Sequence, residues 1–435
     1  MADLTRKVIT CWDASGSYLH MMEAVVGDFA RILYYSPYES GFPVPKNFLP
    51  GYGVDGIERI GVGQDIEDFW DAVEISDLIV FTDVGNYGLQ EYLRGQNVPV
   101  FGSGRSGRLE QDRLYLKSVA RKLGLDVADY TSIRGIDQLR DFLMGTNETA
   151  PAAECYVKLS YFRGLAETFH HVSPFMTRSW LDELSLEAGP YAQEIDFLIE
   201  KPIDDEPCIE VGIDSYCADG LFPETIMWGY EADKDNCYVG TTGALPKRLA
   251  EIRDRLSPEL ARQRYRGTLS TETRECESKS YFIDFTARFP EPPSSLQRFM
   301  ISNWAEILWE TANGRIVEPD FSASIGVQIV WKSNYGKDHP LAVSVGRPDR
   351  VTIHGHAVID GQDYAVSPAE LEEQGGAVGL GSTVAEALED AVDAAESIQG
   401  REVKFDAGSL EKIAEAIQKG NALGLEWSNT YGRAA

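Results

Sequence analysis

The chain has 435 residues, of which 43% are hydrophobic and 11% aromatic, so we expect two to four domains with packed cores and exclude general disorder. Its 69 acidic and 40 basic residues give a formal net charge of −29, which argues against binding to duplex nucleic acid or to anionic membrane surfaces. An anionic ligand would therefore need a local basic pocket.

The cysteines and the N-terminus predict the compartment. The six cysteines, at positions 11, 155, 208, 217, 237 and 276, show no C-x-x-C pair and no zinc-finger spacing. We expect reduced core thiols. The N-terminus lacks the apolar segment of a signal peptide, and no run approaches the roughly 18 apolar residues of a membrane span. The sequence therefore predicts a soluble, cytoplasmic protein.

Residues 1–106 alternate between strand and helix patterns. Strands are predicted at 7–12, 31–35, 78–81 and 98–101, and helices at 18–28 and 65–73. This rhythm predicts a doubly wound parallel sheet. The first strand ends in the loop 13–17 (DASGS), at the position where such sheets bind ligands. Because the loop lacks a GxGxxG pattern, a plain turn between strand and helix is the alternative to a nucleotide site.

The next segment carries cationic candidates. A helix is predicted over 109–123 after a glycine-rich break, so its N-terminus and Arg113 can attract an anion. The run ECYVK places Lys158 on a predicted strand. In the following turn, Gly164 beside Arg163 would let backbone N–H groups approach a phosphate. A solvated edge charge is the alternative for Lys158. Residues 137–144 form another predicted helix.

Two predicted strand regions carry acidic faces. Strands at 191–199 and 208–216 are predicted as neighbours, and Glu210 shares a face of the second with Asp214. A strand over 281–289 places Asp284, Thr286 and Arg288 on one face. Carboxylates fixed on a strand suit a magnesium ion that holds substrate phosphates. An ion pair between Asp284 and Arg288 on a solvated face is the alternative.

Short strands at 327–331 and 350–354 and helices at 383–398 and 409–419 complete the predicted elements. His354 and His356 would share one strand face and could bind a metal ion, but no third ligand is near them in the sequence.

The order of these features resembles the ATP-grasp superfamily, and in particular the glycinamide ribonucleotide synthetases. Residues 109–130 resemble a family segment in which a helix precedes a Gly-Ile-Pro-Thr-Ala-type strand. Residues 283–289 (IDFTARF) resemble the family's Glu-Phe-Asn-x-Arg-Phe. Residues 375–388 are similar to the Gly-Gly-Arg-Val-Leu-Gly pattern and helix of the last domain.

The resemblance implies an α/β architecture with the ATP-grasp fold. An N-terminal doubly wound domain would span 1–106, and the ATP-grasp region would span 107–325, with a small lid subdomain at about 118–190. A C-terminal mixed α/β domain and tail would span 326–435.

The resemblance also implies an enzyme, an ATP-dependent carboxylate–amine ligase that releases ADP and passes through an acyl phosphate. Its cofactors would be ATP and Mg2+, and its partners a small-molecule acid and an amine, with the chain a monomer or homodimer. The alternatives are a nucleotide-binding or scaffold protein with little turnover, and an ATP-grasp kinase.

The site residues follow from the same resemblance. The implied catalytic residues are Arg288 and Lys158. The implied nucleotide-binding residues are Arg113, Lys158, Arg163, Gly164, Glu194, Asp196, Phe197 and Glu210. The implied metal ligands are Asp284, Glu272 and Thr286.

Departures from the family pattern bear on the substrates. Thr286 replaces the asparagine of the metal motif, and Pro290-Glu-Pro-Pro293 replaces Gly-Asp-Pro-Glu, so Glu291 is an alternative metal carboxylate. Loop 13–17 lacks the family's glycine-rich pattern. A carboxylate such as Asp13 would repel a phosphate by roughly 4 kcal/mol at 4 Å. We therefore expect substrates other than phosphoribosylamine and glycine.

Overall fold

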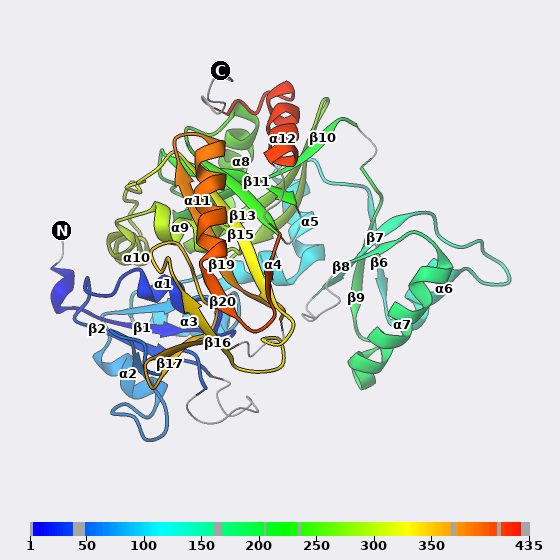
Figure 1. The fold of residues 1–435 in the computed structure, drawn as a ribbon. Helices are drawn as coiled ribbons and strands as arrows, with labels where there is room; N and C mark the ends of the chain where they lie inside the picture. Colours follow the sequence, from blue (N-terminus) through cyan, green and yellow to red (C-terminus); the bar gives the residue numbers. More distant parts are fainter. Residues whose placement is uncertain are drawn as a thin grey trace, which may run out of the picture. The chain divides into compact units, whose positions relative to one another are not determined.

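The computed structural model describes residues 3–37, 48–160, 168–203, 206–233, 236–366, 371–406 and 410–427. The chain forms two compact units (Figure 1). Unit 1 comprises Met1–Gly107, Ile209–Ser270 and Thr286–Ala435, and unit 2 comprises Arg108–Cys208 and Thr271–Phe285. The division at 1–106, 107–325 and 326–435 stays a prediction.

Unit 1 contains a five-stranded parallel sheet in the order β3-β2-β1-β4-β5. Its strands are β1 (Val8–Trp12), β2 (Arg31–Tyr35), β3 (Glu58–Arg59), β4 (Leu78–Phe81) and β5 (Val100–Phe101). Successive side chains of β4 enter different cores: Leu78 and Val80 pack in a cluster with α1 (Leu19–Glu23) and α10 (Trp304–Ala312). Ile79 and Phe81 pack with residues of α2 (Phe69–Ile75) and α3 (Tyr87–Gly95). Helices thus cover both faces, which confirms the predicted doubly wound sheet.

An antiparallel sheet forms the second layer of unit 1. Its successive neighbours are β10 (Cys208–Ala218), β11 (Ile226–Asp233), β12 (Cys237–Gly243), β15 (Ile325–Ser333) and β19 (Glu373–Gly381), and β21 (Val403–Phe405) also pairs with β15. Helix α11 (Val384–Glu396) packs along β15 and β19 (Figure 1). A Cβ atom at Gly379 would lie 1.9 Å from the carbonyl oxygen of Ala387. The glycines of this strand therefore allow the helix to approach closely.

A smaller sheet in unit 1 has the order β17-β18-β16-β20. Its strands are β16 (Leu341–Val345), β17 (His356–Ile359), β18 (Gln362–Ala365) and β20 (Ile398–Gly400). The predicted strand at 350–354 is wrong, because this segment makes one isolated bridge at Val351 and then turns at Gly355 (φ 58°). The remaining α-helices of this unit are α8 (Lys247–Gln263), α9 (Pro293–Met300) and α12 (Leu410–Ala422).

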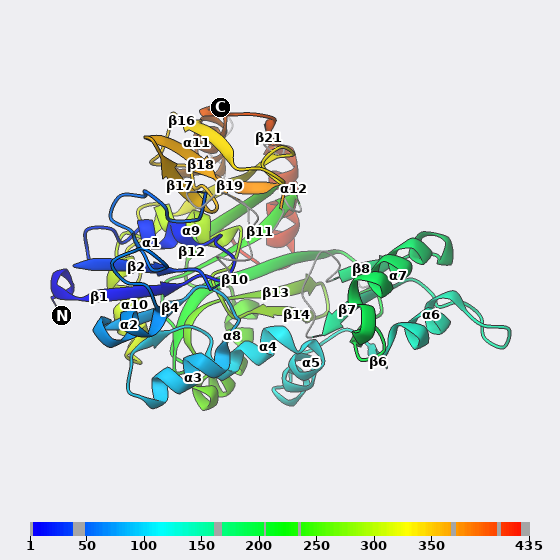
Figure 2. The same ribbon diagram turned by 90° about the horizontal axis from the view of Figure 1, so that it is seen from below.

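Unit 2 contains a four-stranded antiparallel sheet in the order β6-β9-β7-β8. Its strands are β6 (Tyr130–Arg134), β7 (Cys155–Ser160), β8 (Thr168–His171) and β9 (Asp196–Glu200). Helices α6 (Ile136–Met144) and α7 (Pro174–Ala188) lie beside this sheet (Figure 2). They share a core with Val157, Leu159 and Phe197 of one sheet face. The period-2 alternation leaves Lys158 and Leu198 on the other face.

Helical and strand segments outside this sheet supply the rest of unit 2. The chain forms α4 (Gly107–Gln111) and α5 (Arg113–Lys122), so the single helix predicted over 109–123 is interrupted. Asp112 causes the interruption, because its side chain accepts a hydrogen bond from the Tyr115 amide and caps α5. Most of β14 (Ser280–Thr286) and the end of β13 (Arg266–Cys276) also belong to this unit.

The predicted pairing of strands at 191–199 and 208–216 is wrong. Residues Gly189–Tyr191 form a 3-10 helix, and β9 begins at Asp196. Strand β9 lies between β6 and β7, whereas β10 follows β13 in the order of a different sheet. The two strands are consecutive in the sequence but do not pair.

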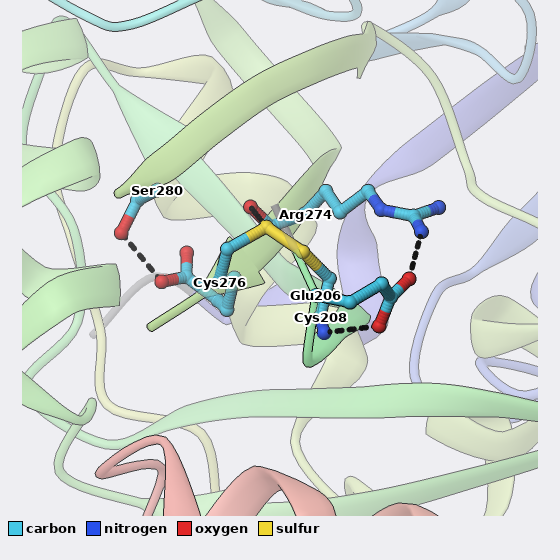
Figure 3. The surroundings of a disulfide bond; sticks show 6 residues. Glu206, Cys208, Arg274, Cys276 and Ser280 are labelled. Carbon is cyan, nitrogen blue, oxygen red and sulfur yellow. Dashed lines mark hydrogen bonds and ion pairs between the residues drawn. A yellow bond between two sulfur atoms is a disulfide. The ribbon is translucent and has the colours of Figure 1, made fainter. Parts of the chain in front are cut away.

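Cys208 and Cys276 form a disulfide bond in unit 2 (Figure 3). Beside it, the Glu206 carboxylate accepts hydrogen bonds from the Cys208 amide at 2.9 Å and from the Arg274 guanidinium at 2.9 Å. The expectation of reduced thiols is therefore wrong for this pair, because the fold brings together two cysteines 68 positions apart. The other cysteines (Cys11, Cys155, Cys217 and Cys237) are buried thiols outside this disulfide bond.

None of the described helices is both long enough and apolar enough to span a membrane.

Candidate active site

Five ionisable side chains meet in the interior of unit 2. Lys158 points from the sheet face opposite α6 and α7, and α5 packs against β7 on which it lies. Its Nζ atom is 3.2 Å from Glu200 Oε2 and 3.6 Å from Asp284 Oδ2. Lys117 of α5 lies 2.8 Å from the other Glu200 oxygen, and Arg113 lies 2.5 Å from Asp284 Oδ2. We call these five residues the charge cluster.

The charge cluster is almost closed to solvent. The side chains of Lys117, Glu200 and Lys158 are 1%, 6% and 9% exposed. Lys117 also donates to the backbone carbonyl oxygens of Ile283 at 2.6 Å and Phe282 at 3.3 Å. Three cations surround two carboxylates, and the Glu272 carboxylate also acts electrostatically on Lys158. On so acidic a chain, an anionic ligand would need such a local group of cations.

The ion pairs set the protonation of the cluster. Burial opposes the ionisation of Asp284, but Arg113, Lys158 and Lys117 together hold its pKa below the ordinary value. Burial likewise opposes the ionisation of Glu200, and the two lysines lower its pKa. Burial lowers the pKa of Lys117, whereas at Lys158 the attraction of Asp284 and Glu200 overcomes burial and raises the pKa. The carboxylates therefore stay ionised at neutral pH.

The structure brings together three of the predicted site residues: Lys158, Arg113 and Asp284. Glu272 of β13 belongs to the same unit and contributes to the electrostatic potential at Lys158. Sequence reasoning missed Lys117 and Glu200. The signal for Lys117 was available, because it adjoins Leu116 in the apolar stripe of its helix, where a lysine is unusual.

The predicted adenine-binding residues lie on or near β9. Glu194 and Asp196 face Arg134: Glu194 accepts a hydrogen bond from it, and an Asp196 oxygen is 3.9 Å away. Phe197 is fully buried in the core. The backbone of β9 pairs with β6 on one side and β7 on the other. The backbone of β9 is therefore occupied by its two neighbouring strands, and the adenine-binding role of these residues stays a prediction.

Arg163 and Gly164 lie outside the described residues. Thr286, Arg288 and Glu210 belong to unit 1. Arg288 donates to the Tyr18 hydroxyl, and its Nε lies 3.6 Å from Asp83 Oδ1. Glu210 is exposed at the start of β10.

Asp13 organises the turn after β1. Its fully buried carboxylate accepts hydrogen bonds from the amides of Gly16 at 2.9 Å and Tyr18 at 3.0 Å, and from the hydroxyls of Ser15 at 3.0 Å and Tyr34 at 2.9 Å. Burial raises the pKa of Asp13, although these bonds oppose the rise. The expectation that Asp13 repels a substrate phosphate directly is wrong, because the carboxylate faces its own loop.

His354 and His356 do not act as a pair. Both ring nitrogens of His356 are engaged, Nδ1 by Glu23 at 2.6 Å and Nε2 by Asp363 at 3.0 Å. The ring of His354 instead lies beside that of His20, with centroids 5.9 Å apart. Glu291 is 3.9 Å from His354 Nε2. Burial raises the pKa of Glu291 to about 8 and lowers that of His354 to about 4.

No protein-family model and no curated protein matches this sequence. Solved structures match over most of its length. For biotin carboxylase from Campylobacter jejuni, solved as a complex with β-γ-ATP, the TM-score is 0.61 at 13% identity, covering 91% of this chain and 92% of that one. A second match is the biotin carboxylase domain of 2-oxoglutarate carboxylase from Hydrogenobacter thermophilus, solved with MgADP, ADP and bicarbonate. Its TM-score is 0.62 at 11% identity, and the match covers 97% of this chain and 99% of that domain.

These likenesses establish the class of fold: the chain has the ATP-grasp fold, with an N-terminal doubly wound sheet. Within that class it resembles phosphoribosylamine–glycine ligase from Thermotoga maritima, with a TM-score of 0.67 at 16% identity, covering 92% of this chain and 98% of the ligase.

Proposed function

We propose that this protein is an ATP-dependent carboxylate–amine ligase. The observation that carries the proposal is the charge cluster, in which Arg113, Lys117 and Lys158 converge inside an ATP-grasp fold. Lysine ammonium groups act as point charges on phosphates, and the arginine guanidinium can bind two phosphate oxygens at once. Glu200 and Asp284 would hold these cations in place until a triphosphate takes over part of their contacts.

The residues present also fit a magnesium ion. A metal ligand must be deprotonated, and the three cations lower the pKa of Asp284. Asp284 would hold Mg2+ together with Glu272, which belongs to the same unit. Bound magnesium would neutralise negative charge on the phosphates.

In the proposed reaction, an oxygen of the substrate carboxylate forms a bond to the γ-phosphorus, and the bond between this phosphorus and the β–γ bridging oxygen breaks. ADP leaves with the electron pair of that bond. The amine nitrogen then attacks the carbonyl carbon of the acyl phosphate, inorganic phosphate departs, and the nitrogen loses a proton. Lys158 and Arg113, which belong to one unit, would stabilise the charge on the transferring phosphoryl group.

The proposal is tested by following what ATP becomes. Purified protein with ATP and magnesium is assayed for ADP and phosphate against amino acids paired with candidate amines and nucleotides. A ligase releases both products only when acid and amine are present together. ADP with a stable phosphorylated product would indicate a kinase, and ATP that binds without being consumed would indicate a binding or scaffold protein.

Lys158→Met tests the site. Losing one charge-assisted contact should weaken ATP binding by roughly 1.5–3 kcal/mol, or about 10- to 150-fold. Lys279→Met is the matched control, because Lys279 lies in the same unit with its side chain 51% exposed. Calorimetry with magnesium present measures both affinities. Equal ATP affinity in the two variants would remove Lys158 from the nucleotide site.

A further inference from the structure

Three side chains distant in the sequence direct their ligand atoms at one another in unit 1. His20 lies in α1, Glu291 precedes α9, and His354 precedes β17. Glu291 Oε1 is 3.3 Å from His20 Nε2 and 3.9 Å from His354 Nε2. The three ligand atoms lie within 4.8 Å of one another, and this is the one such group of histidine, cysteine and acidic side chains found among the described residues.

The two imidazoles are oriented as metal-binding histidines are. His20 Nδ1 is 3.1 Å from the carbonyl oxygen of Ser17, and the ring of His354 bonds to the backbone of Glu373. The Nε2 atom of each ring is buried without a hydrogen-bond partner, and the His20 side chain is 0% exposed. An imidazole that donates from Nδ1 to a carbonyl presents the lone pair of Nε2, and histidines that bind metal ions are usually held by such a hydrogen bond.

The carboxylate is also held in place. Glu291 Oε1 accepts a hydrogen bond from Ser294 Oγ at 2.6 Å, and Oε2 accepts one from Ser295 Oγ at 3.1 Å. Both serine contacts come from the first turn of α9, so they fix the carboxylate where it faces the two Nε2 atoms.

We propose that His20, Glu291 and His354 bind a divalent transition-metal ion through the two Nε2 atoms and a carboxylate oxygen. Ligand atoms about 2.0–2.1 Å from a tetrahedral ion lie about 3.4 Å apart, so small side-chain movements would complete the site. Imidazole nitrogens with one carboxylate favour zinc(II) or a similar ion over magnesium, which prefers oxygen ligands. This site is distinct from the magnesium site proposed at Asp284.

The ion would keep one coordination position open. A cavity of about 90 Å3 is lined by Glu291 and His354 together with Glu231, Gln328 and Glu373. Three protein ligands beside an accessible space are typical of zinc sites that bind water or a substrate atom, whereas structural sites are closed by four protein ligands. The cavity therefore gives the ion contact with a small polar ligand.

Metal binding is tested on the whole protein without nucleotide, so the result does not depend on the proposed ligase activity. Protein stripped with a chelator is titrated with zinc chloride, and separately with cobalt chloride, whose visible spectrum reports its ligands. We expect one ion per chain by elemental analysis, and X-ray absorption of the zinc form should show two imidazoles and an oxygen ligand. Uptake well below one ion per chain, or a shell without two imidazoles, would overturn the site.

His354→Gln and Glu291→Gln should each weaken zinc binding at least tenfold. His170→Ala is the matched control, because His170 lies in unit 2 with a 41% exposed side chain, and its zinc affinity should equal that of the wild type. Circular dichroism checks that each variant folds. A folded His354→Gln variant with wild-type affinity would overturn the assignment. If neither variant folds, the zinc titration and the X-ray absorption spectrum of the wild type decide whether these three residues bind the ion.

Discussion

Lys117 is the most buried cation of the charge cluster, and two carbonyl oxygens and Glu200 satisfy its ammonium group. Replacing it with methionine keeps the length of the side chain and leaves a buried carboxylate short of one partner. We expect Lys117→Met to lower the free energy of unfolding by roughly 3–5 kcal/mol, since breaking one side of a buried ion pair leaves an uncompensated charge. Urea denaturation measures the change.

Lys122 at the exposed end of the same helix is the control. Lys122→Met should change stability by less than about 0.5 kcal/mol. If the two variants were equally stable, Glu200 would have Lys158 as a sufficient partner, and Lys117 would have no structural role in the cluster.

Asp214 of β10 predicts a pH dependence. Its buried carboxylate accepts a hydrogen bond from the Tyr238 hydroxyl, but burial dominates and raises its pKa to about 6. The folded state therefore favours the protonated form. The stability contributed by Asp214 is complete at low pH and is lost as the pH rises from about 4 to about 6. Over two pKa units the loss is on the order of 3 kcal/mol.

Asp214→Asn removes this ionisation and retains an acceptor for Tyr238. Urea denaturation at pH 7.5 should show the variant to be more stable than the wild type by up to about 3 kcal/mol, and the difference should disappear near pH 4. A difference that is the same at both pH values would show that ionisation of Asp214 is not its cause.

At the scale of elements, the disulfide links β10 to β13 inside unit 2. A cross-link between residues 68 positions apart restricts the unfolded chain, and its removal should lower the free energy of unfolding by about 2–4 kcal/mol. We expect the double variant Cys208→Ser, Cys276→Ser to show this loss against oxidised wild type. Wild type and variant should be almost equally stable in a thiol reductant. A thiol count of six in the unreduced wild type under denaturing conditions would contradict the bond.

Elements with strong local patterns were predictable from the sequence. The strand predicted at 78–81 matches β4, because its apolar run is buried on both faces. The strand that carries Lys158 was also predicted correctly, since β-branched and aromatic residues favour a strand over β7. The strand prediction for 350–354 failed because the chain turns at Gly355. Only glycine fits there, since a Cβ atom would collide with the backbone of Val366.

Contacts across long sequence separations were not predictable. Lys158 and Asp284 could be connected through a family motif, but Glu200 carries no motif and gains its role only where β9 pairs with β7. The partner of His354 was sought nearby in the sequence, whereas the fold supplies His20. The disulfide was missed for the same reason.

At the scale of the whole molecule, the fold is shared with a phosphoribosylamine–glycine ligase and with biotin carboxylases, so the fold alone does not set the substrates of the proposed ligase, and local loops must do so. The turn after β1 is one of these loops. A glycine-rich loop at the carboxyl end of a parallel strand can offer backbone amides to a phosphate. Here Asp13 already accepts hydrogen bonds from the amides of Gly16 and Tyr18. These two amides of the turn are therefore bonded to the Asp13 carboxylate and not available to a phosphate.

From this arrangement we predict that the protein does not form glycinamide ribonucleotide at an appreciable rate from phosphoribosylamine and glycine. The amides of this turn are occupied, and releasing them would leave the buried Asp13 with only two of its four donors, the hydroxyls of Ser15 and Tyr34. The measurement supplies both substrates with ATP and magnesium and follows ADP and the glycinamide product. A phosphoribosylamine–glycine ligase assayed in parallel shows that the unstable amine has survived. Product formation at a rate near that of the control enzyme would mean that another segment binds the phosphate and that the closed turn does not set the specificity.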